Sequence, residues 1–219
     1  MNTISDTVRF CADLGMFTID RSISKSCTHK TSFCESNCFN DKLYKLYPAM
    51  HDKDVRNELA WDNLDQRTSK QFSRSMARKR RQTSRIRLMS RGEAFSVVGD
   101  VAKVKVLLSE NPDSLFWIPT RAWRNPVIWA LVQSEIMPLS NGRVMASLDP
   151  SNTDVERRDL ESAGFSTMYF GDDEKTAGRF KCPKTWQKSH GKDKKVYCDA
   201  KCRNGCFSDK QVHVHLKKH

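Results

Sequence analysis

The chain lacks any apolar run long enough to cross a membrane. Its longest notable run is Val127-Ile-Trp-Ala-Leu-Val132, whereas a helix needs roughly 20 apolar residues to span a bilayer. The first residues, Met1 to Thr7, contain an acid and no apolar core, so they do not resemble a secretory signal. We therefore expect no membrane partner and a cytoplasmic location.

The sequence also lacks the short motifs of several enzyme classes. It contains no Gly-x-Ser-x-Gly elbow, no Walker-type phosphate loop, no Gly-x-Gly-x-x-Gly turn and no His-Glu-x-x-His pair. The common hydrolase, nucleotide-binding and zinc-peptidase patterns are therefore missing. With 38% hydrophobic and 29% charged residues among 219, the composition is that of a globular protein.

Cysteine is present in two groups. Three thiols fall within twelve positions, and four more lie near the other end, while Cys11 stands apart. In a reducing compartment, eight cysteines are explained more simply by metal binding than by disulfides, which are the alternative. Thiolates are the soft ligands of zinc, copper(I) and iron–sulfur clusters. The predicted metal ligands are Cys27, Cys34 and Cys38, and Cys182, Cys198, Cys202 and Cys206.

The spacing of the cysteines bears on the choice of metal. Three thiolates leave one iron of a [4Fe-4S] cluster open to a substrate or cofactor, whereas four close a cluster completely. Zinc is the alternative: His29 could complete a site of three cysteines and one histidine, and the second group could form an all-thiolate site. Zinc motifs usually separate two cysteines by two to four residues, which Cys27-x6-Cys34 does not match. We therefore favour iron–sulfur, more clearly at the first group than at the second.

Apolar runs alternate with helical patterns through the middle of the chain, which predicts an α/β fold. We expect a parallel sheet of about five strands, either open or a partial (β/α) barrel, with function at the carboxyl ends of the strands. A helix over 52–64 should bury Val55, Leu59 and Leu64, and in a closing strand over 211–216 His213 and His215 should face solvent. The expected strands are 15–20, 86–89, 115–118, 143–148 and 166–170, and the expected helices 39–48, 52–64, 98–108, 125–136 and 154–163.

The formal charge of +12 is concentrated at the carboxyl end, where residues 175–219 hold 13 Lys and Arg against 3 Asp. This excess suits a polyanion such as nucleic acid, and equally the compensation of an anionic cluster. A second basic segment runs from Arg74 to Arg91. It is either a nucleic-acid-binding helix or a solvated basic face, and the near absence of aromatic residues favours the solvated face.

Several of these features resemble phage proteins of the gene product 88 type. They are the Cys27-x6-Cys34-x3-Cys38-Phe39 spacing, the following helix that ends near Pro48, and the terminal Cys182-Pro183…Cys198-x3-Cys202-x3-Cys206 pattern. The resemblance implies an iron–sulfur protein, located in the host cytoplasm if phage-encoded. It also implies two regions: residues 1–170 with the three-cysteine loop, and a basic cysteine-rich extension over 171–219.

A more distant resemblance is to radical S-adenosylmethionine (SAM) enzymes, which build a partial (β/α) barrel with a three-cysteine loop after the first strand. Their Gly-Gly-Glu segment after the second strand receives the amino group of SAM, and Gly92 and Glu93 stand at that place here. Arg121, just past the third strand, could clamp an anionic substrate or a SAM carboxylate, and a surface salt bridge is the alternative. Ser147 and Asp149 could face the same edge and hold a ribose. The Cys-x3-Cys-x2-Cys spacing of that superfamily is absent.

These observations leave two functions open. The first is an iron–sulfur enzyme that cleaves SAM reductively and abstracts hydrogen from a substrate that the sequence does not identify. The second is a non-enzymatic module, stabilised by zinc or by a cluster, that binds nucleic acid through Arg74–Arg91 and the tail. For Ser147 and Asp149, a helix-capping turn over Asp149-Pro-Ser-Asn is the simpler structural explanation.

Overall fold

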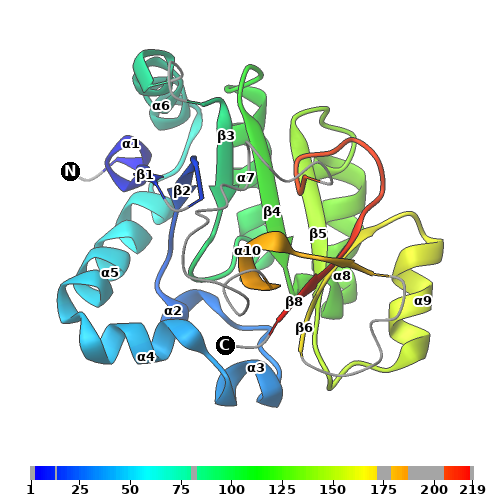
Figure 1. Cartoon of the computed structure of the whole chain (residues 1–219). Helices are drawn as coiled ribbons and strands as arrows, with labels where there is room; N and C mark the ends of the chain where they lie inside the picture. The colour runs from blue at the N-terminus through cyan, green and yellow to red at the C-terminus, as the bar shows by residue number, and fades with distance from the viewer. Residues whose placement is uncertain (1–2, 13, 80–82, 172–178, 187–204, 218–219) are drawn as a thin grey trace.

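The computed structural model describes residues 3–12, 14–79, 83–171, 179–186 and 205–217 (Figure 1). Eight strands among them form one open, mostly parallel sheet. In chain order the strands are β1 (Arg9–Cys11), β2 (Met16–Ile19), β3 (Arg85–Leu88), β4 (Leu115–Thr120), β5 (Gly142–Leu148), β6 (Ser166–Phe170), β7 (Phe180–Lys181) and β8 (His213–Leu216).

The strands lie side by side in the order β1-β2-β3-β4-β5-β6-β8-β7. Only β1 runs antiparallel to its neighbour; every other adjacent pair is parallel. The five predicted strands are therefore confirmed as β2 to β6, and the predicted closing strand as β8. The expected total was too low, because β1 and β7 have only three and two residues and leave no readable pattern. Within the described residues the sheet does not close into a barrel.

Helices follow most strands and fill the crossovers that parallel neighbours require. Asn125 caps one helix with its side-chain oxygen and places Pro126 at its first position, as the sequence predicted. Thr153 and Glu156 form a capping box at the start of another. The helices are α1 (Ile4–Thr7), α2 (Ile23–Ser26), α3 (Ser32–Ser36), α4 (Phe39–Leu46), α5 (Pro48–Asp62), α6 (Gln66–Lys79), α7 (Val98–Ser109), the 3₁₀ turn η1 (Ala122–Arg124), α8 (Pro126–Leu131), the π-helical turn η2 (Val132–Ile136), α9 (Asp154–Ser162) and α10 (Pro183–Trp186).

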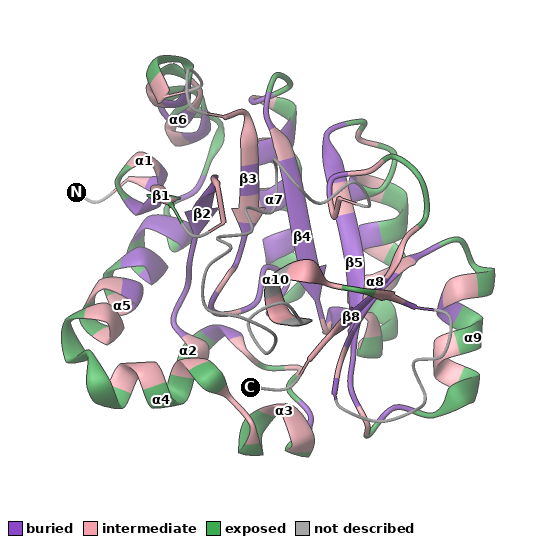
Figure 2. Ribbon diagram, viewed as in Figure 1, coloured by how far each residue is buried: buried purple, intermediate pink, exposed green. Residues whose placement is uncertain are grey.

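The main core lies between one face of the sheet and helices α1, α5, α6, α7 and α8. In β3, Ile86 and Leu88 point into this core, while Arg85 and Arg87 alternate with them and point to the other face. Figure 2 shows the purple, buried residues that run along β4 and β5. The first core thus fixes the positions of the strand ends that carry the candidate site.

The opposite face of the sheet is covered by the carboxyl-terminal part of the chain. A second apolar cluster forms there around Trp117, with Phe207 against it at a ring distance of 6.2 Å. Arg87 lies over the Trp117 ring at 4.6 Å from its centroid. Figure 1 shows α10 in front of β4, on the side away from α7. The extension therefore packs on the sheet and adds β8 and β7 to it, although the boundary at residue 170 stays a prediction.

Helix α5 differs from its sequence prediction. Leu59, expected on the buried side, is 57% exposed, whereas Asp54, Glu58 and Trp61 are buried. The prediction that this helix buries Leu59 was wrong, because its inward face is polar and its charges are compensated by residues elsewhere in the chain.

The prediction that both histidines of β8 face solvent was wrong for His215 and held only in part for His213. His215 is only 2% exposed, its Nε2 lies 2.6 Å from the carbonyl oxygen of Gly171, and its ring meets Tyr169 edge-on. His213 is partly buried, with Nδ1 at 2.9 Å from Thr167 Oγ1. Both faces of β8 are covered, so alternation along the strand does not separate core from solvent.

No helix within the described ranges is both long enough and apolar enough to span a membrane.

Candidate metal centre at the carboxyl edge

The three-cysteine loop follows β2 and lies at the carboxyl ends of the parallel strands, below the sheet in Figure 1. Cys27 ends α2, Cys34 lies within α3, and Cys38 caps the start of α4. Thr31 caps α3 by accepting a hydrogen bond from the Cys34 amide at 2.9 Å. Three short helices joined by tight turns thus form the loop that carries Cys27, Cys34 and Cys38.

The three thiols are close enough to influence one another electrostatically. Burial raises the pKa of Cys27 to about 12, and the charges of Glu93, Cys34 and Cys38 contribute to the rise. A thiol with such a pKa stays protonated at neutral pH, so a metal that binds there must displace its proton. Cys27, Cys34 and Cys38 are thus close enough for their charges to interact, and their role as metal ligands stays a prediction.

Arg121 follows β4 and reaches the middle thiol. Burial raises the pKa of Cys34, Arg121 opposes that rise by its charge and a hydrogen bond, and Cys38 and Asp149 add to it. The Arg121 guanidinium also donates to Asp149 Oδ2 at 2.7 Å, with 13% of its side chain exposed. It is therefore a fixed positive charge beside the thiols.

Asp149 follows β5 and holds the cysteine loop from the other side. Its Oδ2 accepts from Thr31 Oγ1 at 2.6 Å, and its Oδ1 accepts from the Ser151 amide at 2.9 Å. Burial opposes ionisation of Asp149, but hydrogen bonds from Ser151 and Thr31 and the charge of Arg121 lower its pKa. The expected capping turn is present, and the same carboxylate also ties β5 to the loop.

Glu93 follows β3 and links three loops. Its Oε1 accepts from the amides of Ala94 and Phe95 and, at 2.8 Å, from Thr120 Oγ1. Its Oε2 accepts from the Arg121 amide at 2.9 Å. A carboxylate offers about four acceptor positions, two on each oxygen. Since Oε2 accepts one hydrogen bond, from the Arg121 amide, it can accept another.

Gly92 has a backbone φ of +84° and sits against the cysteine loop. A Cβ atom there would lie 2.6 Å from Ser26 Oγ and 2.8 Å from the Arg21 carbonyl oxygen. The space beside Gly92 is filled by Arg21 and Ser26, in the segment that leads to Cys27. Glycine is required here because both the conformation and the space exclude a side chain.

Beneath the loop lies a buried network of charges that sequence reasoning missed. Arg21 donates to Glu58 Oε2 at 3.0 Å and to Asp100 Oδ2 at 3.0 Å, and Glu58 Oε1 accepts from the Ser22 amide at 2.8 Å. Trp61 Nε1 donates to Asp100 Oδ1 at 2.8 Å. These contacts join the start of the cysteine loop to α5 and α7.

A second part of this network holds the loop that carries Gly92. Arg91 donates to Asp54 with both Nε and Nη2, and its Nη2 lies 2.8 Å from Asp20 Oδ2. Asp20 also accepts from the Ser90 hydroxyl and from the amides of Ser90 and Arg91. Arg91, predicted within a basic nucleic-acid-binding segment, is only 4% exposed. Arg74 in α6 is exposed, as the solvated-face interpretation expected.

Ser147 lies in β5 at 8% exposure, on the face of the sheet that Met145 shares. Among the second cysteine group, Cys182 and Cys206 pack against the cluster around Trp117 and Phe207. Cys198 and Cys202 lie outside the described residues. None of the six described cysteines forms a disulfide.

Zinc and a [4Fe-4S] cluster require different spacings between their protein ligands. Within the described parts of the chain, no three His, Cys, Asp or Glu side chains lie close enough to hold a single ion. Ligands of one zinc ion must stand about 4 Å apart, because each Zn–S bond is about 2.3 Å long. The thiolates of a cubane cluster bind different irons and so stand further apart than the ligands of one zinc ion. His29 Nε2 is buried without a hydrogen-bond partner, which is the feature that fits zinc.

The comparisons with known proteins identify a family and no function. The model of the gene product 88 family matches residues 8–218, so the chain belongs to this phage-type family. No curated protein and no solved structure matches it.

Proposed function

We propose that this protein is an iron–sulfur protein whose cysteine loop holds an open-site [4Fe-4S] cluster, with chemistry like that of radical SAM enzymes. One observation carries the proposal: Cys27, Cys34 and Cys38 lie in one loop at the carboxyl edge, where Glu93, Arg121 and Asp149 follow three successive strands. Function in parallel α/β folds concentrates at this edge.

The order of strands β2 to β6 adds support. Each strand lies beside the one before it, and α7 and α8 pack on one face of the sheet, an arrangement that a partial (β/α) barrel shares. The three-cysteine loop follows β2 and Glu93 follows β3, in the same relation as in radical SAM enzymes. The sheet stays open, so the likeness concerns the arrangement and not closure.

A [4Fe-4S] cluster with three protein ligands supplies one-electron chemistry and one open iron position. The residues of the chain then have separate tasks. The Arg121 guanidinium stabilises negative charge at the Cys34 thiolate, and Asp149 fixes that guanidinium and the α3 cap at Thr31. Glu93 Oε2 could accept from the ammonium group of SAM.

The proposal includes a second, closed centre held by Cys182, Cys198, Cys202 and Cys206. Cys182 and Cys206 both contact the apolar cluster on the face opposite the main core. Apolar surroundings exclude water from a metal centre, so this placement suits a structural or electron-transfer role.

The alternative is a zinc-stabilised, non-enzymatic module that binds nucleic acid. His29 favours zinc, because its Nε2 is buried without a partner in the same loop as Cys27 and Cys34. The exposed cations of α6, such as Arg74 and Arg78, would supply phosphate contacts.

The decisive measurement is the metal content of the full-length protein after anaerobic purification. The proposal expects about four irons per chain for one cluster and about eight for two, with matching acid-labile sulfide. Replacing Cys34 by Ala should remove about four irons, whereas the matched change Cys11→Ala, in β1, should remove none.

Other outcomes separate the alternatives. Zinc without iron in the purified protein would overturn the proposal and support the module. If the protein contains iron but forms no 5′-deoxyadenosine from SAM and dithionite, the cluster part of the proposal stands and the radical SAM part is wrong.

A further inference from the structure

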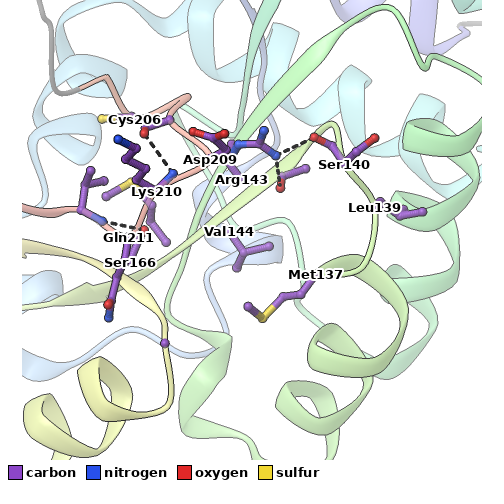
Figure 3. A pocket seen from close by; sticks show the side chains of 15 residues that line it. Met137, Leu139, Ser140, Arg143, Val144, Ser166, Cys206, Asp209, Lys210 and Gln211 are labelled. Carbon is purple, nitrogen blue, oxygen red and sulfur yellow. Dashed lines mark hydrogen bonds between the residues drawn. The ribbon is translucent and has the colours of Figure 1, made fainter.

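A pocket of about 430 Å³ opens at the amino ends of β5, β6 and β8, at the edge opposite the cysteine loop (Figure 3). Its walls come from three segments: the turn that leads into β5, the turn before β6, and the segment before β8. Its volume lies in the range of small-molecule sites in proteins. The pocket shares no residue with the three-cysteine loop, and Cys206 of the second cysteine group is one of its lining residues.

The lining divides into an apolar part and a polar part. Met137, Leu139, Val144 and Met145 supply the apolar surface, and Met137 is 39% exposed although it is a large apolar side chain. The polar part consists of serines, Cys206, Gln211 and charged groups. Its charged members are Arg143, Asp209 and Lys210, which leave one positive charge in excess.

Arg143 is held in place before any ligand arrives. Its Nη1 donates to the carbonyl oxygens of Ser140 at 2.6 Å and Gly142 at 3.2 Å, as Figure 3 shows. Its Nε is buried without a hydrogen-bond partner, and no ion pair joins Arg143 or Lys210 to a carboxylate within the described residues. A fixed guanidinium bonded only to neutral carbonyls keeps its full positive charge for an anion.

We propose that this pocket binds a small amphipathic anion, a molecule with one carboxylate, phosphate or sulfonate head and a short apolar body. The head pairs with Arg143, with Lys210 at the rim, and the body lies along Met137, Leu139 and Val144. Preorganisation of Arg143 by two backbone carbonyls lowers the entropy lost on binding. Because the three-cysteine loop lies at the other edge, binding does not depend on a metal held there.

The test uses anilinonaphthalene sulfonate, a fluorescent amphipathic anion, titrated into the full-length protein. We expect a single saturable site and displacement of the probe by octanoate, with much weaker displacement by octanol or by inorganic phosphate. Replacing Arg143 by Gln should weaken binding of the probe roughly tenfold or more. Arg158→Gln removes an exposed arginine of α9 outside the pocket and should leave binding unchanged.

A second readout locates the ligand. In protein labelled at its methionine methyl groups, octanoate should shift the nuclear magnetic resonance signals of Met137 and Met145, and leave those of Met50 and Met76, far from the lining, unchanged. If Arg143→Gln is poorly folded, Lys210→Gln gives the same comparison with a smaller loss. Equal displacement by octanol and octanoate, or shifts that miss both pocket methionines, would overturn the proposal.

Discussion

The two cysteine groups sit in contrasting surroundings. Around Cys27, Cys34 and Cys38 the neighbours are charged or hydrogen-bonding groups such as Glu93 and Arg121. Cys182 and Cys206 instead pack with Trp117, Phe207 and other apolar side chains. The first group depends on hydrogen bonds and ion pairs between distant loops, and the second depends on close packing.

This difference shows how one residue type serves two purposes. A polar shell with fixed donors stabilises developing negative charge on thiolates and leaves a site open to ligands. An apolar shell excludes water and holds its residues through buried apolar surface and close packing. The two groups should therefore respond to different substitutions.

The largest expected effect is at the polar group. Arg91→Met removes the charged partner of Asp54. Among the described residues, Asp20 then keeps Arg9, whose side chain is partly exposed, as its ion-pair partner. Breaking a buried ion pair on one side costs about 3–5 kcal/mol, which urea unfolding would measure. Lys45→Met, which removes an exposed i,i+4 partner of Asp41, should change stability by less than about 0.5 kcal/mol. A loss below about 1 kcal/mol for Arg91→Met would contradict the structural role assigned to the network.

A substitution at the apolar group should act nearly as strongly. Phe207 is 8% exposed and meets Trp117 and Arg85. Phe207→Ala should cost about 3 kcal/mol and speed amide hydrogen exchange in β8 more than in β3. The change Phe10→Ala, at a 43% exposed ring, is the control, and equal losses at both positions would mean that Phe207 is not part of a core.

Glycine substitutions separate conformation from crowding at the polar group. Gly92 and Gly164 have φ of +84° and +86°, but only Gly92 is crowded, since nothing lies within 4 Å of a Cβ built at Gly164. Gly164→Ala should cost about 1 kcal/mol, and Gly92→Ala about 2–3 kcal/mol, because the loop of Ser26 must move. Thermal unfolding of both variants measures this difference in stability. Equal losses would mean that the segment around Ser26 moves aside at little cost.

The smallest effect concerns pH at the capping box that follows Asp149. Burial tends to raise the pKa of Glu156, but hydrogen bonds from the Thr153 amide, Asn152 and the Thr153 hydroxyl lower it overall. A carboxylate with a depressed pKa stabilises the fold above its ordinary pKa, and this stabilisation is lost as pH falls through the folded-state value. Glu156→Gln should therefore cost about 0.5–1 kcal/mol at neutral pH.

The difference between Glu156→Gln and the parent should shrink in acid, below the ordinary pKa of a glutamate. Urea unfolding at neutral and acidic pH measures it. A cost that stays constant over this range would mean that the charge of Glu156 does not contribute.

The strands and the edge that carries the candidate site could be predicted because their signals are local. Apolar runs marked β2 to β6, and the carboxyl ends of parallel strands meet at one edge. This rule places Glu93, Arg121 and Asp149 together although they lie 28 residues apart in succession. The start of α9 was equally readable from Thr153 and Glu156.

The rest depended on partners that no local pattern reveals. Asp54 and Glu58 are buried because Arg91 and Arg21 meet them, in both cases across 37 positions. Periodicity assigns the buried side of a helix to apolar residues, and so it selected Leu59 instead. Both faces of β8 are likewise covered because of tertiary packing, which the residue pattern of the strand does not reveal.

The hydrogen bond from Thr31 to Asp149 spans 118 positions of the chain, which has a consequence for biosynthesis. Strands β2 to β5 can pair in the order in which they leave the ribosome, since each neighbour is the next one made. The cysteine loop is synthesised early, yet its last support arrives only after β5 has been translated. Insertion of the proposed cluster should therefore follow synthesis of about two thirds of the protein, and chains truncated before Asp149 should acquire no stable centre.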